Sequence, residues 1–405
     1  MSRFTSPIVL SIAITLLLTG CREKVLMVEK VIKPFQNTID ERRLQLKVPG
    51  ISAAVILPDG TTWLGVSGKS SNKEAMNSAM LFGLGSVTKT YIAALILQLI
   101  EESALSVEDS VGEWIPELGQ IDSNIKIRQL LNHTSGLYRY QQKPEYLAAI
   151  TAQPQKIWTA REILEKFQGK HECQPGSCWG ESAMDYVLLG MIVEKTTGSS
   201  VSNQLIKRFF KPLKLEHTFL YPEQKYRTEI MAHMWWDVSR SGEPVDVIAG
   251  TADLPLAGLF SSLWTSGAML ATAEDLARFA KDLFEGKVLK DNSLKEMLSP
   301  GPELYAGAHY GYSVIVDQVG GQKAYWHSGG AGYSSIYYYL PEKGLSIAVL
   351  CNLMVDPKPI AIALYQAYAE HQKGDLARRA NKNEEISADV NARWRERKAD
   401  CHQPD

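Results

Sequence analysis

The pattern of apolar and polar positions gives the chain a strand-rich beginning, a helical middle and a strand-rich end. Two β-prone runs, residues 51–57 and 61–66, flank the dipeptide Asp59-Gly60, which is typical of a hairpin turn. Segment 91–100 has apolar residues on nearly every side, as a fully buried helix does. The first third therefore predicts a hairpin followed by a helix in the middle of the fold.

From residue 101 to about 256 the chain reads as helical stretches joined by polar loops. One predicted helix, starting at residue 127, ends in the polar turn 132–136, and another ends at Gly198, because glycine readily adopts the left-handed conformation that closes a helix. We interpret this segment as a helical insertion. After it, Thr272 is placed to cap an amphipathic helix.

The last third returns to a strand pattern. Its four predicted strands are residues 310–316, 323–327, 335–340 and 345–350. The run Pro341-Glu342-Lys343-Gly344 is expected to form a hairpin turn, and the strands to extend the sheet begun at residue 51. A helix over 361–370 is expected to cover that sheet, and a first helix to continue to Leu46.

Composition changes this picture little, but it excludes some functions. With 405 residues, 45% hydrophobic and 22% charged, the chain suits one large domain or two closely packed ones. A formal net charge of −2 gives no basic surface for nucleic acid, and no cysteine and histidine spacing is typical of zinc. We therefore expect no nucleic-acid partner, no metal and no cofactor.

The N-terminus has the pattern of a targeting segment. Arg3 precedes an apolar run over 8–18, which is too short for a spanning helix. The run ends in Leu18-Thr19-Gly20-Cys21, which resembles the signal of bacterial lipoproteins, whose cysteine is lipidated; an ordinary secretory peptide cut nearby is the alternative. By the same resemblance, Arg22 favours an outer-membrane destination in a Gram-negative cell.

Five cysteines are present, and four remain once Cys21 is assigned to lipid. Cys173 and Cys178 flank a Pro-Gly turn, so a local disulfide is plausible in an oxidising compartment. Two free thiols are the alternative.

One short stretch carries candidate chemistry. Ser86 and Lys89 are three residues apart at the start of the buried helix, so both side chains share one face. A neighbouring base can activate a serine, and helix-start amides can stabilise an oxyanion. The same spacing at Ser70 and Ser123 opens no apolar helix, and Ser86 can also be read as a simple helix cap beside a snorkelling Lys89.

The order of several motifs resembles the serine β-lactamase and penicillin-binding protein superfamily, in its class C-like branch, over residues 48–369. The pieces are Ser86-x-x-Lys89, Leu131-Asn132-His133-Thr134-Ser135-Gly136-Leu137, Tyr186-Val187-Leu188-Leu189-Gly190, 211–218 and His327-Ser328-Gly329. The resemblance implies an α+β fold, in which an antiparallel β-sheet is flanked by helices and carries an inserted all-helical domain. The active site would lie in the cleft between these parts.

The resemblance also implies roles for individual residues. Ser86 would be acylated and Lys89 would be its base; His327 and Ser328, followed by Gly329, would line the cleft and bind a substrate carboxylate or position its carbonyl. The amides of Ser86 and Gly330 would form the oxyanion hole.

The middle motif departs from the family. Counted without gaps, its tyrosine-x-asparagine falls on Glu181-Ser182-Ala183. A carboxylate at 181 would hold Lys89 as an ammonium, so Glu181 itself would be the base. The alternatives are that Tyr138 or Tyr140 replaces the tyrosine, or that Glu181 is a solvated loop residue.

These observations predict a serine hydrolase that forms an acyl-enzyme on a β-lactam, D-alanyl peptide or ester in the cell envelope. The alternative is a non-catalytic protein of the same fold that binds peptidoglycan or another envelope ligand. The predicted parts are a lipoprotein signal peptide (1–21), a tether (22–40), a catalytic domain (41–372) with its helical insertion (101–256), and a charged tail typical of disorder (373–405).

Overall fold

The computed structural model describes residues 33–116, 119–224, 230–237, 242–248 and 256–374. The described residues between 39 and 362 form one compact unit, and the described residues 33–38 and 363–374 belong to a second. A first helix spans residues 33–45 and a last one spans 358–374, as expected for both ends of the fold. The predicted signal peptide, Cys21 and the tail beyond residue 374 lie outside the described residues. Among those described, no helix is long and apolar enough to cross a membrane.

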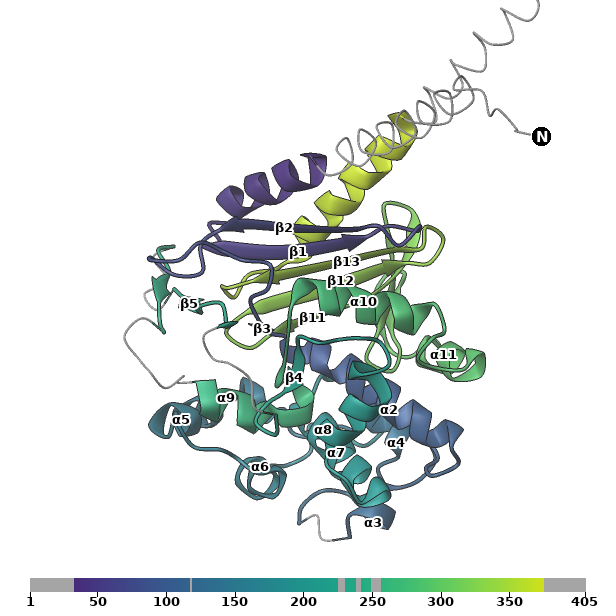
Figure 1. Cartoon of the computed structure of the whole chain (residues 1–405). Coiled ribbons are helices and arrows are strands. Elements are labelled where there is room, and N and C mark those ends of the chain that lie inside the picture. The colour runs from purple at the N-terminus through teal and green to yellow at the C-terminus, as the bar shows by residue number, and fades with distance from the viewer. Residues whose placement is uncertain (1–32, 117–118, 225–229, 238–241, 249–255, 375–405) are drawn as a thin grey trace, which may run out of the picture. The chain divides into compact units, whose positions relative to one another are not determined.

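The larger unit is built on an eight-stranded antiparallel sheet with the order β2-β1-β13-β12-β11-β10-β9-β8 (Figure 1). Its strands are β1 (Gly50–Ile56), β2 (Thr62–Gly68), β8 (Glu303–Tyr305), β9 (Ala308–Tyr310), β10 (Ile315–Val319), β11 (Gln322–Gly330), β12 (Ser334–Leu340) and β13 (Leu345–Cys351). β1 pairs with β2 on one side and with β13 on the other. This confirms the predicted hairpin and the prediction that strands from the last third of the chain extend the same sheet.

One predicted strand is wrong. Residues 310–316 do not form a single strand, because β9 ends at Tyr310 and β10 begins at Ile315. Between them Ser313 has a positive φ of 54°, and a methyl group on Gly311 would lie 2.2 Å from the carbonyl oxygen of Met297. The backbone turns sharply here against a neighbouring segment, which the β-prone side chains of the run do not reveal.

Helices occupy most of the segment between β3 and β8. They are α2 (Thr88–Glu101), α3 (Val111–Trp114), α4 (Ile127–Leu131), α5 (Pro144–Ala152), α6 (Ala160–Phe167), α7 (Ala183–Thr197), α8 (Val201–Leu205), α9 (Leu256–Leu263), α10 (Ala273–Phe284) and α11 (Asp291–Met297). As predicted, Gly198 closes α7 with a φ of 63°, and the hydroxyl of Thr272 caps α10. In Figure 1, α10 lies against the sheet, in contact with β1, β12 and β13, and α2 lies beside α7.

Short strands interrupt these helices. β3 (Phe82–Gly83), β4 (Thr218–Leu220) and β7 (Met269–Ala271) form a small sheet, and β5 (Trp235–Trp236) pairs with β6 (Val245–Asp246). The segment predicted as all-helical therefore also contains β4, β5 and β6.

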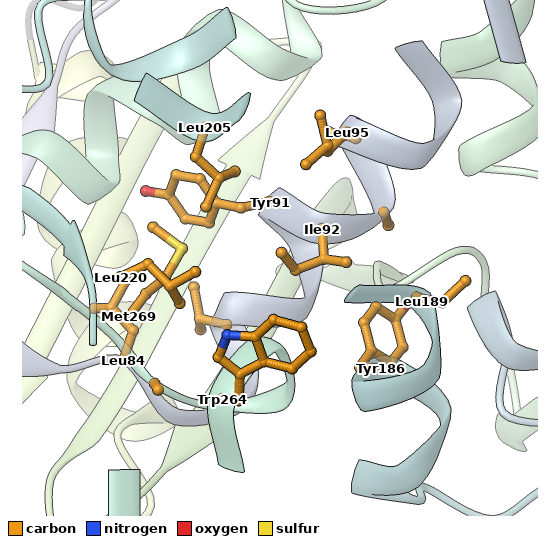
Figure 2. Close-up of a cluster of buried hydrophobic side chains, with 14 of the residues drawn as sticks. Leu84, Tyr91, Ile92, Leu95, Tyr186, Leu189, Leu205, Leu220, Trp264 and Met269 are labelled. Atoms are coloured by element: carbon orange, nitrogen blue, oxygen red, sulfur yellow. The ribbon is translucent and has the colours of Figure 1, made fainter. Parts of the chain in front are cut away.

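Helix α2 lies in the centre of the hydrophobic core, as its sequence predicts. Tyr91, Ile92 and Leu95 are fully buried on it. Figure 2 shows these three side chains among residues from several other elements, including Leu205 of α8 and Leu189 of α7. Close packing on all sides fixes the position of α2, so the residues at its N-terminal end are held rigidly.

Asn352 ties three segments of the sheet region together, which gives a test of stability. Its Oδ1 accepts from the amide of Gly50 at 2.7 Å, and its Nδ2 donates to the carbonyls of Lys69 and Ser70 at 3.1 and 3.3 Å. We expect Asn352→Ala to lower the free energy of unfolding by about 2–4 kcal/mol, because buried backbone groups lose their partners. Urea unfolding measures this, with Asn292→Ala, at an exposed position of α11, as a control that changes it by less than about 0.5 kcal/mol. Equal losses in both variants would contradict the role of Asn352.

Candidate active site

The candidate nucleophile lies on a tight turn that leads into α2. A 3-10 turn, η1 (Gly85–Val87), carries Ser86, and Lys89 follows in the first turn of the α-helix. Lys89 is 2% exposed, and its Nζ lies 2.6 Å from Ser86 Oγ. The predicted pairing of these two side chains on one face is therefore present in the structure.

Glu181 completes this cluster from a distant part of the chain. Ser86 Oγ donates to Glu181 Oε1 at 2.8 Å, and Lys89 Nζ donates to the same oxygen at 2.9 Å. The Glu181 side chain is 34% exposed, whereas that of Lys89 is buried. The three side chains thus form a closed triangle that is open to solvent on the glutamate side.

The position of Glu181 is fixed by its neighbours at the start of α7. Ser182 caps this helix, and its hydroxyl donates to the carbonyl of Tyr138 at 3.0 Å. Gln141 donates to the carbonyl of Glu181 at 2.8 Å and accepts from the amide of Ala183 at 3.2 Å. A residue held on both sides by such bonds is not a freely solvated loop residue.

The charges in the triangle favour an ion pair. Burial is the largest single influence and raises the pKa of Glu181, but the charge and hydrogen bond of Lys89, together with His133 and His327, hold the pKa of that carboxyl well below its ordinary value. Glu181 is therefore a carboxylate throughout the neutral range. A carboxylate that accepts the hydroxyl proton of Ser86 is oriented to receive that proton when the serine reacts.

The strand β11 approaches the serine closely enough to require glycine. A methyl group on Gly329 would lie 2.0 Å from the carbonyl oxygen of Leu84 and 2.6 Å from the amide nitrogen of Ser86. One on Gly85, whose φ is 51°, would lie 2.5 Å from the amide nitrogen of Gly330. The two backbones are thus in contact, and the amides of Ser86 and Gly330 lie on neighbouring segments, as an oxyanion hole needs.

His327 lies beside this cluster with both ring nitrogens engaged. Nδ1 is 2.7 Å from the carbonyl oxygen of Ser328, and Nε2 is 2.9 Å from the hydroxyl of Tyr310. Burial lowers the pKa of His327 to about 4, so the ring is neutral near pH 7. Its Nδ1–H then donates to the carbonyl and its Nε2 accepts from Tyr310. Both nitrogens of His327 are therefore already occupied and cannot bind a substrate carboxylate. Of the two residues predicted for this role, the partly exposed Ser328 is better placed than His327.

Sequence reasoning missed two groups next to the site. Tyr310 was expected inside a strand with no special role, and a single buried tyrosine carries no signal in the sequence. The second group is a buried trio in which Asp185 bonds His133 Nδ1 and Ser135 Oγ, both at 2.5 Å. Burial raises the pKa of Asp185 above its usual value. The motif of residues 131–137 marked His133 and Ser135, but nothing in the sequence pointed to Asp185.

Comparison with known proteins agrees with this geometry. The sequence model of the Beta-lactamase family matches residues 32–370. The chain belongs to this family. Penicillin-binding protein 4 of Amycolatopsis lactamdurans is 25% identical over 344 residues, which cover 78% of this chain and 84% of that protein. The described fold is therefore that of a β-lactamase-type serine hydrolase.

Two further proteins that are similar to this chain have names that state an activity. The D-amino acid amidase of Ochrobactrum anthropi SV3, in complex with L-phenylalanine amide, superimposes with a TM-score of 0.73 at 26% identity and covers 84% of this chain and 99% of its own. The teichoic acid D-alanine hydrolase of Staphylococcus aureus is 30% identical over 147 residues, 36% of this chain. The matched residues make up 34% of the length of that protein.

The tyrosines considered as substitutes for the family's missing tyrosine do not reach the serine. The hydroxyl of Tyr140 donates to the carbonyl of Ser262 at 2.8 Å, and that of Tyr138 donates to Glu145 at 2.7 Å. Both interactions lie away from Ser86, so Glu181 alone of the three predicted candidates meets Ser86 and Lys89.

Three remaining candidates lie outside the cluster. Ser70 is buried and its Oγ accepts from the amide of His233 at 3.0 Å, a structural contact. Cys173 and Cys178 form a disulfide. Within the described ranges, no group of three histidine, cysteine or acidic residues is placed to hold a metal ion.

Proposed function

We propose that this protein hydrolyses amides or esters in the bacterial cell envelope through an acyl-enzyme on Ser86. The observation that carries the proposal is the triangle in which Ser86 donates to Glu181 while Lys89 donates to both. A serine in ordinary surroundings is a poor nucleophile, and this arrangement supplies an acceptor for its proton and a positive charge beside its oxygen.

Acylation begins with attack of Ser86 Oγ on the substrate carbonyl carbon, while the hydroxyl proton passes to Glu181. A carboxylate of low pKa is a weak base, so the Lys89 ammonium must stabilise the charge developing on Oγ. The carbonyl oxygen becomes an oxyanion and is met by the amides of Ser86 and Gly330. The tetrahedral intermediate then expels the leaving amine or alcohol, which takes the proton from Glu181.

Deacylation repeats these steps with water. Glu181, which is 34% exposed, accepts a proton from a water molecule that attacks the acyl carbon. Ser86 leaves with that proton, and the carboxylate and ammonium return to their starting charges. Lys89 therefore acts as electrostatic support throughout, in place of the base expected from the family.

The reaction and the relatives support a substrate with an amide or ester carbonyl. An amidase of D-amino acids and a D-alanine hydrolase share this family, and a penicillin-binding protein shares most of the chain. A β-lactam, a D-alanyl peptide and an ester all present the carbonyl that the mechanism needs. The envelope location is supported by the lipoprotein-like run 18–21.

A fluorophosphonate probe tests the nucleophile. We expect the intact mass of the parent protein to rise by one adduct and peptide mapping to place it on Ser86, because the Ser86 hydroxyl bonds both a carboxylate and an ammonium. Ser86→Ala should take up no probe, whereas Ser70→Ala should react like the parent. Failure of the parent to react would favour the non-catalytic, ligand-binding alternative, and an adduct on another serine would overturn the assignment.

The pH dependence of acylation tests the base. Because the pKa of Glu181 is held well below that of an ordinary glutamate, we expect acylation to remain fast as the pH falls to 5, with its acid limb below the ordinary glutamate range. Glu181→Gln should acylate about 10²–10⁴-fold more slowly, as expected for loss of a general base. Stopped-flow measurement with an activated ester gives both rates. A Glu181→Gln variant as fast as the parent at every pH would show that Glu181 is not the base.

Lipidation of Cys21 is the basis of the proposed anchor. Expressed in a bacterium, the full chain should partition into the detergent phase of a Triton X-114 extraction, because two acyl chains hold a protein stably to a membrane. Cys21→Ser should move to the aqueous phase. If both proteins partition alike, the anchor is wrong.

A further inference from the structure

A cavity of about 740 Å³ shares one residue, Gln141, with the surroundings of the candidate site. It is formed by α5, by residues around β5 and by α9. Its apolar lining includes Tyr146, Leu147, Ile150, Met234, Trp236 and Leu259. A volume of this size is typical of sites for small organic ligands.

Two contacts join the cavity to the reacting groups. Gln141 lines the cavity and also bonds the carbonyl of Glu181 and the amide of Ala183, so it forms a wall shared with the base. On another side, the sulfur of Met234 lies against Gly332, where a methyl group would approach it to 1.9 Å. Gly332 follows the oxyanion-hole glycine, Gly330, by two residues. Gln141 and Met234 therefore link the lining of the cavity to the backbone of Glu181 and to the segment that follows Gly330.

The described lining residues offer no unpaired charge. Among the described residues that line it, Lys143 is the one with a charge, and Nζ of that lysine lies 3.4 Å from Glu172 and 4.8 Å from the centre of the Tyr138 ring. A charged group would lose its hydration on entering without gaining a free counter-ion. The lining thus favours a neutral, apolar occupant.

The rim of the cavity is open and apolar. Leu147 is 52% exposed and Trp236 is 45% exposed. Exposure of large apolar side chains to water is unfavourable, so covering them with an apolar ligand would release free energy. Tyr146, Ile150 and Met234 are buried and form the deeper part. A chain entering past the rim would cover the exposed pair and reach the buried floor.

We propose that this cavity binds a bulky apolar group of the substrate, such as an alkyl chain or aromatic ring joined to the scissile ester or amide. The inference rests on the proposed function, because it takes Ser86 as the nucleophile. It narrows that function: the methyl group of a D-alanyl unit is far too small to fill 740 Å³, so the preferred substrate carries a larger hydrophobic part.

Two series of esters test the proposal on the purified protein. One series is p-nitrophenyl esters with acyl chains of two to twelve carbons, and the other is acetate esters of alcohols of increasing length. Each methylene that enters the cavity should raise kcat/KM by about fourfold, from the transfer free energy of one methylene group. We expect a rise of at least tenfold between four and eight carbons in one of the two series. If kcat/KM is independent of chain length in both, the proposal is overturned.

Variants at the rim locate the effect. Leu147→Asp should abolish most of the increase in kcat/KM with chain length, because a long chain reaches the new charge. The kcat/KM for p-nitrophenyl acetate should stay the same, because its short chain does not. Trp236→Ala should reduce the gain in the same direction. Leu64→Asp is a matched control, since Leu64 is 40% exposed on β2 and is not among the residues that line the cavity. An equal loss of the gain in Leu64→Asp would contradict the proposal.

A binding measurement separates this proposal from the proposed function. Ser86→Ala keeps the cavity without the nucleophile, so calorimetry with N-ethyldecanamide measures occupation alone. Binding that is at least tenfold weaker in Ser86→Ala/Leu147→Asp supports the cavity even if no ester is turned over. Turnover of short esters by the parent without measurable binding of the long amide to Ser86→Ala would leave the hydrolase intact and overturn the cavity.

Discussion

The structure depends on one ion pair at the N-terminal end of a buried helix. Lys89 is 2% exposed, and an ammonium so far from water is tolerated only with a counter-charge and hydrogen-bond acceptors. Glu181 supplies the charge and Ser86 supplies a second acceptor. Stabilising the lysine therefore also orients the serine hydroxyl toward a carboxylate, so a structural requirement and a chemical one are met by the same three side chains.

The rest of the fold brings this pair together and keeps it rigid. Helix α2 is fixed by the core around it, as Figure 2 shows for Tyr91, Ile92 and Leu95. The glutamate is fixed by the cap of α7 and by Gln141. Strand β11 is held against the serine by glycines that leave no room for a side chain. Three elements that are far apart in the sequence thus converge around Ser86.

Much of this was readable from the sequence because it rests on local patterns. The hairpin, the buried helix and the Ser86–Lys89 pair follow from turn residues, apolar periodicity and helical spacing. Glu181 was found by ungapped counting between recognisable motifs. The break between β9 and β10 was missed because it arises from contact with Met297, which no local pattern encodes. Tyr310, Asp185 and the apolar cavity were missed for the same reason, since each is defined by contacts between distant segments.

The central claim is that Lys89 and Glu181 act on Ser86 as one unit. A double-mutant cycle on the rate of Ser86 acylation tests it most directly, with Lys89→Met, Glu181→Gln and the double variant measured at pH 7 against one activated ester. If the two groups form a unit, each single substitution should lose nearly as much rate as the double one, because either change leaves the other group without its function. If the fold-loss of acylation rate in the double variant equals the product of the two single fold-losses, the two groups act independently and the account is contradicted.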